Sequence, residues 1–296
     1  MSTPVVAPRS LLYVPAVRPE LFDKAVAGAS DAVILDLEDA VPADRKTEAR
    51  THLRTWLESE SSAGGDVLPT NETEVWIRVD PDSLGDDLDV AARPGVRGVV
   101  LAKCTAASLH ATDEMLGRLE GERGLMTGTI LVIGLLESAR ALVELGQMTA
   151  MRPRGRLLTF GIGEADLLGD LRMTRSERSA AALDALRVQV VVHCAATGLA
   201  APVAPTSTAF RDLEAFEETT RHFADLGFRS RTAIHPGQVP VIHEVLSPSV
   251  EEVDRAREVM ARFAAAAGGV TTDVDGRLID AAVVRTAREV LQRAER

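Results

Sequence analysis

The chain has 296 residues, of which 46% are hydrophobic, and it carries a formal net charge of −11. This length and composition allow one large hydrophobic core. The acidic balance argues against nucleic acid or an anionic membrane as the main partner. The two cysteines, Cys104 and Cys194, fit neither a disulfide framework nor a zinc site. The first residues show no signal pattern, and no apolar run approaches the roughly 18 residues that span a bilayer. We therefore expect a soluble, cytoplasmic protein.

Short apolar runs rich in Val, Ile and Leu recur along the chain, and each is followed by a stretch with helical spacing. Apolar strands that alternate with helices are typical of a parallel sheet covered on both faces. Eight strands over about 250 residues predict an α/β fold, the closed (β/α)8 TIM barrel. A doubly wound open sheet is the alternative, but no Gly-rich dinucleotide turn follows the first strand. The predicted strands are 11–16, 32–40, 74–80, 98–104, 129–137, 157–164, 200–207 and 231–236.

Helical spacing fills the intervals between these strands. A further helix over 82–92 is weakly predicted because it carries many acidic residues, and 59–74 is expected to be a surface loop. Two helices follow the eighth strand and exceed what a barrel needs, so we expect a barrel domain over 1–247 and a helical extension over 248–296. The predicted helices are 19–29, 46–59, 106–122, 138–150, 175–198, 212–227, 249–268 and 279–296.

Charged residues gather where the predicted strands end. In a barrel of this kind, catalytic groups come from the carboxyl ends of the strands and the loops that follow them. Any one such acid is more often a helix cap or a solvated turn, but the whole set favours an active site. Two carboxylates from adjacent strands, completed by water and substrate oxygens, commonly hold Mg²⁺. The set comprises Glu38, Asp39, Arg78, Asp80, Lys103, Glu137, Glu164, Asp166 and His235, the last of which could equally make a structural hydrogen bond.

Several segments resemble the citrate lyase β-subunit-like proteins of the HpcH/HpaI aldolase superfamily, near the malyl-CoA and citramalyl-CoA lyases. The most specific are LDLEDAV (35–41) and AIHPGQ (233–238). The resemblance extends in order over essentially the whole chain. It implies a (β/α)8 barrel with a C-terminal helical extension, in homotrimers or hexamers. The other segments are RSLLYVPAVRPELFDKA (9–25), WIRVD (76–80), VVLAKC (99–104), GLLESARAL (134–142), FGIGEADLLGDL (160–171) and DGRLIDAAVVRTA (275–287).

The resemblance also implies roles for particular residues. Glu137 and Asp166 match the family's Mg²⁺ ligands, and Arg78 matches its arginine for the substrate carboxylate. Glu38 and Asp39 would orient that arginine and balance its charge. Further candidates for substrate binding are Arg9 and Lys103.

Asp280 lies in the helical extension and has two interpretations. It could simply be the N-cap of the last helix, where Asp is favoured. The other acids of the rim are committed to the metal or to Arg78, however, and the resemblance places an Asp here on a lid that reaches the active site of a neighbouring subunit. Asp280 is therefore a candidate general base that acts in trans.

Three departures from the family pattern leave the metal site intact but put the substrate in doubt. Thr105 stands where relatives often carry a carboxylate, Val203-Ala204-Pro205 replaces a segment with an Asp, and Arg172 stands in place of a Gly. The expected chemistry is the Mg²⁺-dependent cleavage of a 3-hydroxyacyl thioester into acetyl-CoA and an α-keto acid, or the reverse reaction. The sequence does not say whether the thioester is carried by CoA or by an acyl-carrier protein. The alternatives are a malyl-CoA-type thioesterase and a non-catalytic β-subunit-like binding protein.

Overall fold

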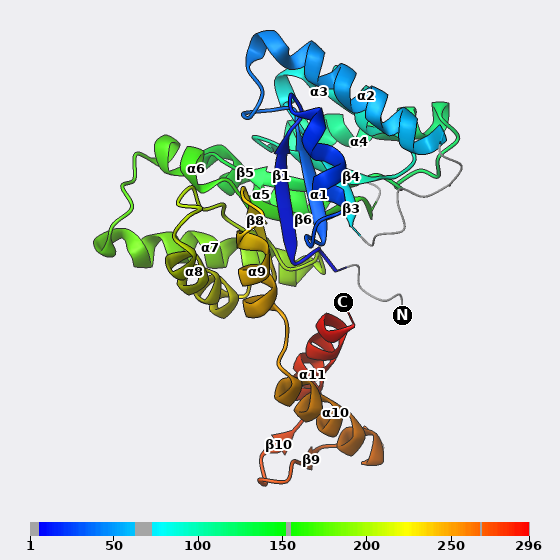
Figure 1. Ribbon diagram of the computed structural model, residues 1–296. Helices are drawn as coiled ribbons and strands as arrows, with labels where there is room; N and C mark the ends of the chain where they lie inside the picture. Colours follow the sequence, from blue (N-terminus) through cyan, green and yellow to red (C-terminus); the bar gives the residue numbers. More distant parts are fainter. Residues whose placement is uncertain (1–5, 63–72, 152–154, 267, 296) are drawn as a thin grey trace. The chain divides into compact units, whose positions relative to one another are not determined.

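The computed structural model describes residues 6–62, 73–151, 155–266 and 268–295. Eight parallel strands close into a barrel in the order of the sequence, and β1 pairs with β8 (Figure 1). The TIM barrel and all eight predicted strands are thereby confirmed. The strands are β1 Ser10–Pro15, β2 Ala32–Asp36, β3 Glu74–Val79, β4 Val96–Leu101, β5 Leu131–Leu136, β6 Leu157–Ile162, β7 Val203–Ala204 and β8 Ser230–Ala233.

The barrel interior is filled by apolar side chains from several strands. They include Ile34 of β2, Trp76 of β3 and Ile133 of β5, each no more than 1% exposed. Gly98 of β4 makes room for the largest of them, because a Cβ at this position would overlap the Trp76 indole and the Leu131 carbonyl oxygen. The interior is therefore a packed core and not a channel.

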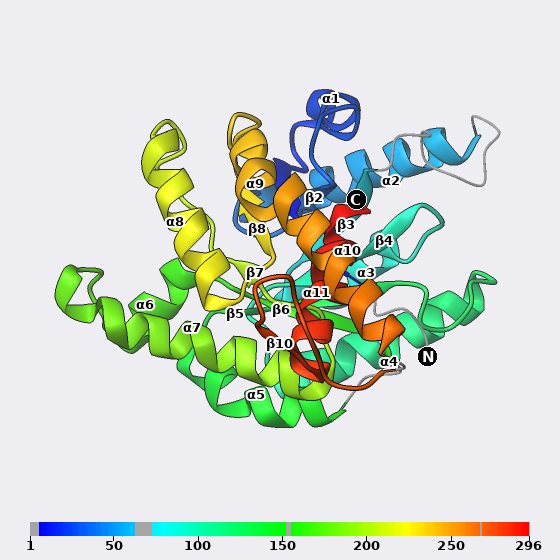
Figure 2. The same cartoon turned by 90° about the horizontal axis from the view of Figure 1, so that it is seen from below.

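Helices surround the strands, as the view from below shows (Figure 2). The predicted helices of the barrel are all present, and the weakly predicted one over 82–92 is formed by η3 and α3. The prediction of a loop from residue 59 is wrong for 59–62, which continue α2, and residues 63–72 lie outside the described residues. The helices are η1 Pro19–Leu21, α1 Phe22–Val26, η2 Ala43–Arg45, α2 Lys46–Ser62, η3 Pro81–Ser83, α3 Leu84–Ala91, α4 Ala106–Glu122, α5 Ala139–Met151, α6 Glu164–Leu171, α7 Glu177–Thr197, α8 Leu213–Leu226 and α9 Gln238–Leu246.

Two of the described α-helices, α6 and α9, were not predicted. α6 follows β6 directly and has only eight residues, so its acidic first turn was interpreted as the end of a strand. It ends at Leu171, and its C-cap Arg172 has a φ of 55°, in the left-handed region that glycine adopts without strain. α9 is nine residues long and contains Pro240 in its first turn, where proline is tolerated. Short helices carry too few turns for a clear periodic signal.

In the described part of the chain, α7 is the one helix long and apolar enough to cross a membrane by length and composition. It also packs against β6 and between α5 and α8, and its side chains Leu183, Val190 and Cys194 are buried there. α7 therefore has the place and contacts of a barrel helix.

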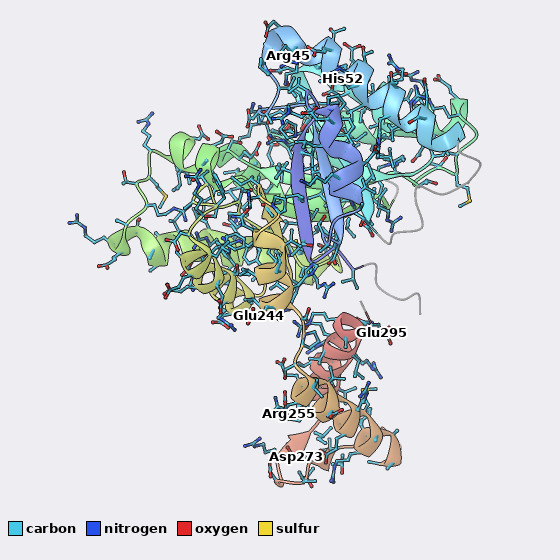
Figure 3. All side chains as sticks on the ribbon, viewed as in Figure 1. Arg45, His52, Glu244, Arg255, Asp273 and Glu295 are labelled. Carbon is cyan, nitrogen blue, oxygen red and sulfur yellow. The ribbon has the colours of Figure 1, made fainter. Side chains whose placement is uncertain are left out.

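The chain divides into two compact units, Met1–Ile242 and His243–Arg296. The boundary falls within α9 and not at 247/248. In the second unit, α10 (Val250–Ala265) packs against α11 (Ala281–Ala294), and β9 (Thr271–Thr272) pairs antiparallel with β10 (Leu278–Ile279). Charged side chains project from this unit, among them Arg255 of α10 and Asp273 beside β9 (Figure 3).

Candidate active site

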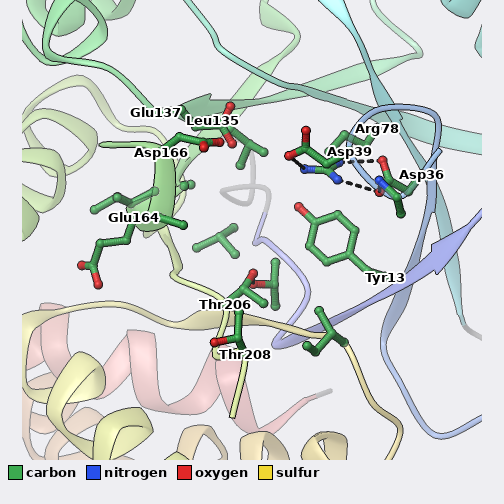
Figure 4. A pocket seen from close by; sticks show the side chains of 18 of the residues that line it. Tyr13, Asp36, Asp39, Arg78, Leu135, Glu137, Glu164, Asp166, Thr206 and Thr208 are labelled. Atoms are coloured by element: carbon green, nitrogen blue, oxygen red, sulfur yellow. Dashed lines mark hydrogen bonds and ion pairs between the residues drawn. The ribbon is translucent and has the colours of Figure 1, made fainter. Parts of the chain in front are cut away.

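A pocket of about 480 Å³ lies at the carboxyl ends of the barrel strands. Strands β1, β2, β3, β5, β6, β7 and β8, or the residues that directly follow them, all contribute to its lining. The lining includes Arg78, Glu137 and Asp166, which the sequence placed at three different strand ends (Figure 4). These three residues therefore line the same pocket, and their roles in binding metal and substrate stay predictions.

Arg78 is held by an acid that was not predicted to contact it. Its Nε and Nη2 donate to Oδ1 and Oδ2 of Asp36 at 2.7 and 2.6 Å. Asp36 and Arg78 are register partners on β2 and β3, so the pairing follows from the strand alignment. The sequence signal was an Asp inside an otherwise apolar strand, where a buried carboxylate requires a partner.

Glu38 and Asp39 contribute unequally to the same cluster. Glu38 Oε2 is 3.0 Å from Nη1 of Arg78, whereas Asp39 Oδ2 is 3.6 Å from the same atom and the Asp39 side chain is 60% exposed.

The guanidinium of Arg78 also lies over the Tyr13 ring, with 4.9 Å between the guanidinium carbon and the ring centroid. Burial disfavours the charged guanidinium, but the hydrogen bonds and charge of Asp36 outweigh it, so the pKa of Arg78 is raised. The arginine is fixed and permanently charged.

Lys103 connects this cluster to the predicted metal ligands. Its Nζ donates to Glu38 Oε1 at 2.7 Å, and this hydrogen bond raises the pKa of Lys103. Its backbone is left-handed, with φ of 46°, and its N–H donates to Glu137 Oε2 at 2.7 Å. Non-glycine residues in this conformation store strain, which is common at functional sites. Lys103 is outside the pocket lining, so it positions neighbouring groups, and its predicted contact with substrate stays a prediction.

Glu137 and Asp166 approach the pocket from β5 and from the first turn of α6. Glu137 is 6% exposed. Burial, together with the nearby charges of Glu38 and Asp166, raises its pKa to about 7 despite the Lys103 N–H and Arg78. Gly163 leaves the space that Glu137 occupies, because a Cβ there would overlap its carboxyl group.

These two carboxylates fit a hard divalent cation. A buried carboxylate whose ionised form is disfavoured gains from a bound metal ion. No group of three His, Cys, Asp or Glu side chains in the described residues is arranged to hold a metal. Two carboxylates plus water and substrate oxygens are the usual way in which Mg²⁺ is bound, whereas zinc requires more protein ligands. The donor set therefore supports Mg²⁺.

One predicted substrate contact is wrong. Arg9 precedes β1 and is at the amino end of the barrel, where its Nε and Nη2 donate to the Asp31 carboxylate at 2.9 and 2.8 Å. The active-site pocket is formed at the opposite, carboxyl end. The resemblance of the segment to the family does not distinguish the two ends of the strand. Arg9 therefore stabilises the amino end of the barrel and does not belong to the site.

Three other charged strand-end residues serve local structure. Glu164 binds Arg187 at 2.7 Å and also Arg175, and it points away from Glu137 and Asp166 (Figure 4). Asp80 caps η3 by accepting from the N–H of Asp82. His235 is exposed, and its Nδ1 accepts from the Gly237 N–H at 3.0 Å, which is the structural alternative expected for it.

Asp280 is the N-cap of α11. Its Oδ1 accepts from the N–H groups of Ala282 and Val283 at 2.9 and 3.1 Å. The expectation of a cap is confirmed. Its second predicted role, as a base in a neighbouring active site, stays a prediction.

We expect Asp36→Asn to damage both stability and activity. Removing one charge of a buried, bidentate pair costs about 3–5 kcal/mol, and Arg78 would lose its fixed orientation. Thermal unfolding and steady-state kinetics measure the two effects. Asp39→Asn is the matched control, because an exposed, longer-range pair contributes about 1 kcal/mol or less. Equal effects of the two substitutions would contradict the assignment of Asp36 as the main partner.

A closed barrel with a carboxylate pair and a fixed arginine at its carboxyl end has the architecture of a barrel enzyme. The chain belongs to the HpcH/HpaI aldolase/citrate lyase family, which matches residues 9–236. Relatives in this family include lyases of CoA esters, and the chain is an enzyme of this kind.

Individual relatives cover almost the whole chain. An L-malyl-CoA/beta-methylmalyl-CoA lyase of Cereibacter sphaeroides is 30% identical over 314 residues, covering 97% of this chain and 94% of the relative. A (3S)-malyl-CoA thioesterase of the same species is 30% identical over 293 residues, with the same coverage. Among solved structures, CitE of Mycobacterium tuberculosis in complex with magnesium, acetoacetate and coenzyme A is similar with a TM-score of 0.72 and 29% identity, covering 99% of this chain and all of that one.

Proposed function

We propose that this protein is an Mg²⁺-dependent carbon–carbon lyase that cleaves or forms a 3-hydroxyacyl-CoA, with acetyl-CoA and an α-keto acid as the other side of the reaction. The observation that carries the proposal is the convergence of Glu137, Asp166 and Arg78 on one pocket. Two relatives support it: a malyl-CoA lyase, and CitE bound to magnesium, acetoacetate and coenzyme A.

In this proposal Glu137 and Asp166 would hold a magnesium ion, which would act as a Lewis acid toward the keto oxygen and the adjacent carboxylate of the substrate. Arg78 binds the carboxylate. Asp36 takes two of its five N–H groups and Glu38 lies close to Nη1, so one N–H on each of Nη1 and Nη2 is left to form a bidentate pair.

In the cleavage direction, a base removes the proton of the 3-hydroxyl group and the C2–C3 bond breaks. The carbon that carried the hydroxyl becomes the keto carbon. The electron pair of the broken bond forms the enolate of acetyl-CoA, which then takes up a proton. Each barrel acid that lines the pocket is paired with an arginine or assigned to the proposed metal. We therefore propose Asp280 of a neighbouring subunit as the base.

The thioesterase is the second candidate, because a (3S)-malyl-CoA thioesterase is as similar in identity as the lyase. Product analysis separates the two activities. We expect the Mg²⁺-loaded protein to release acetyl-CoA and a keto acid from at least one of malyl-, citramalyl- and citryl-CoA. Free CoA thiol without any keto acid would identify a hydrolase instead.

We also propose that the protein is a cytoplasmic homotrimer or hexamer. Both cysteines are buried free thiols, which suits a reducing compartment. On α7, the apolar side chains of Val188 and Val192 are exposed by 37% and 58%, and a second copy could cover them. Light scattering measures the assembly, and a monomer at micromolar concentration would refute it.

Asp280→Asn tests the proposed base separately from the cap, since Asn caps helices as well as Asp does. We expect turnover to be lost while Mg²⁺ and keto-acid binding and the unfolding midpoint are retained. Asp280→Ala, by contrast, should also cost about 1 kcal/mol of stability through the lost cap.

Mixing subunits tests whether Asp280 acts in trans. Inactive Asp280→Asn and inactive Glu137→Gln subunits should regain some activity together, because mixed oligomers contain sites with both groups intact. If subunits are shown to exchange and no activity returns, Asp280 is only a cap.

A further inference from the structure

The active-site pocket has two chemically different sides. Asp36, Arg78, Glu137 and Asp166 make one side charged. The other side is formed by residues of β7 and β8 and of the segments that follow them, and Figure 4 shows Thr206 and Thr208 there, away from Glu137 and Asp166.

The second side carries no charge. Its buried part consists of Val203, Ala204 and Thr232, each no more than 5% exposed. The hydroxyl oxygens of Thr206 and Thr232 are 2.6 Å apart, so these two groups hydrogen-bond to each other. We call this uncharged side of the pocket the neutral wall. A ligand group that lies against it contacts methyl groups and hydroxyls.

Positive charge is scarce in the pocket. Arg78 is the one cationic side chain among the described residues that line it, and Asp36 already compensates much of its charge. Arg78 and a metal ion on Glu137 and Asp166 can together neutralise one α-keto carboxylate. A second carboxylate on the same substrate would face the neutral wall without a cation, and burying an uncompensated charge is unfavourable.

We infer that the site selects monocarboxylic α-keto acids, whose remaining substituent is hydrogen or a small alkyl group, over dicarboxylic ones. This inference rests on the proposed function and names its substrate class. Val203, Ala204 and Thr206 contact the uncharged substituent and so determine specificity. The 3-hydroxyacyl-CoA that is cleaved then carries one carboxylate beside the hydroxyl carbon and no second one.

The test is a comparison of keto acids with the Mg²⁺-loaded full chain. Pyruvate, glyoxylate and oxaloacetate are each titrated calorimetrically and condensed with acetyl-CoA, and the masses of the products identify the acid used. We expect kcat/KM for pyruvate or glyoxylate to be about tenfold or more above that for oxaloacetate. The reason is that the second carboxylate of oxaloacetate would be buried without a partner.

Equal or better use of oxaloacetate would overturn the inference and leave the lyase activity standing. Absence of binding and condensation with all three acids would instead overturn the proposed function, and the inference with it. The two failures are therefore distinguishable.

A pair of variants tests the charge argument directly. Thr206→Lys adds a cation at the neutral wall, and Thr206→Met, of similar length, removes the same hydroxyl without adding charge. We expect Lys, but not Met, to shift the kcat/KM ratio of oxaloacetate to pyruvate upward by about tenfold. Thermal unfolding shows whether both variants are folded. An unchanged ratio in folded Thr206→Lys, or the same shift in Thr206→Met, would overturn the inference.

Discussion

Glu137→Gln and Asp166→Asn are each expected to abolish Mg²⁺-dependent turnover. Both side chains lie at the pocket and approach it from different strand ends. Since mutation of a residue that merely supports a metal ligand typically costs about 10- to 100-fold, loss of a ligand should cost at least about 100-fold in kcat/KM. Calorimetric titration with Mg²⁺ should show weakened metal binding in both variants.

Folding should survive these substitutions. In Glu137→Gln the amide oxygen can still accept a hydrogen bond from the Lys103 N–H, as Glu137 Oε2 does at 2.7 Å.

The dependence of stability on pH also tests the role of Glu137. The pKa of Glu137 is raised to about 7, so without metal its ionisation should lower the free energy of unfolding as the pH rises from about 4.5 to 7. Glu137→Gln should lack this component and gain no stability from Mg²⁺. If EDTA leaves the wild-type activity unchanged, the metal role is wrong.

Strand periodicity and strand ends predicted most of this site. Buried parallel strands are apolar without interruption, so an Arg at 78 and a Glu at 137 stand out where each strand ends. The barrel then brings the carboxyl ends of all strands to one rim. This is why the sequence alone places Arg78, Glu137 and Asp166 at one rim of the barrel.

Pairing across strands could not be obtained in the same way. Asp36 contacts Arg78 because β2 and β3 align these two residues, and register depends on the closed barrel and not on either strand alone. Arg9 was assigned to the site wrongly because the segment that resembles the family, residues 9–25, includes residues at both ends of β1. The resemblance alone does not say at which end of the barrel a residue lies. The neutral wall likewise could not be predicted from the sequence, because residues of β7 and β8 meet only in the folded barrel.

Arg78→Lys is expected to reduce kcat/KM by tenfold or more, about 1.4 kcal/mol or above. A lysine can place one ammonium near Asp36, but it cannot donate in parallel to Asp36 and present a second fork to a substrate carboxylate. The loss should appear in the binding of the keto acid as well as in turnover, while Mg²⁺ binding at Glu137 and Asp166 is largely kept. That combination separates this variant from the metal-ligand variants. An Arg78→Lys enzyme within about threefold of the wild type, roughly 0.65 kcal/mol, would remove the guanidinium from the mechanism and leave it a structural partner of Asp36.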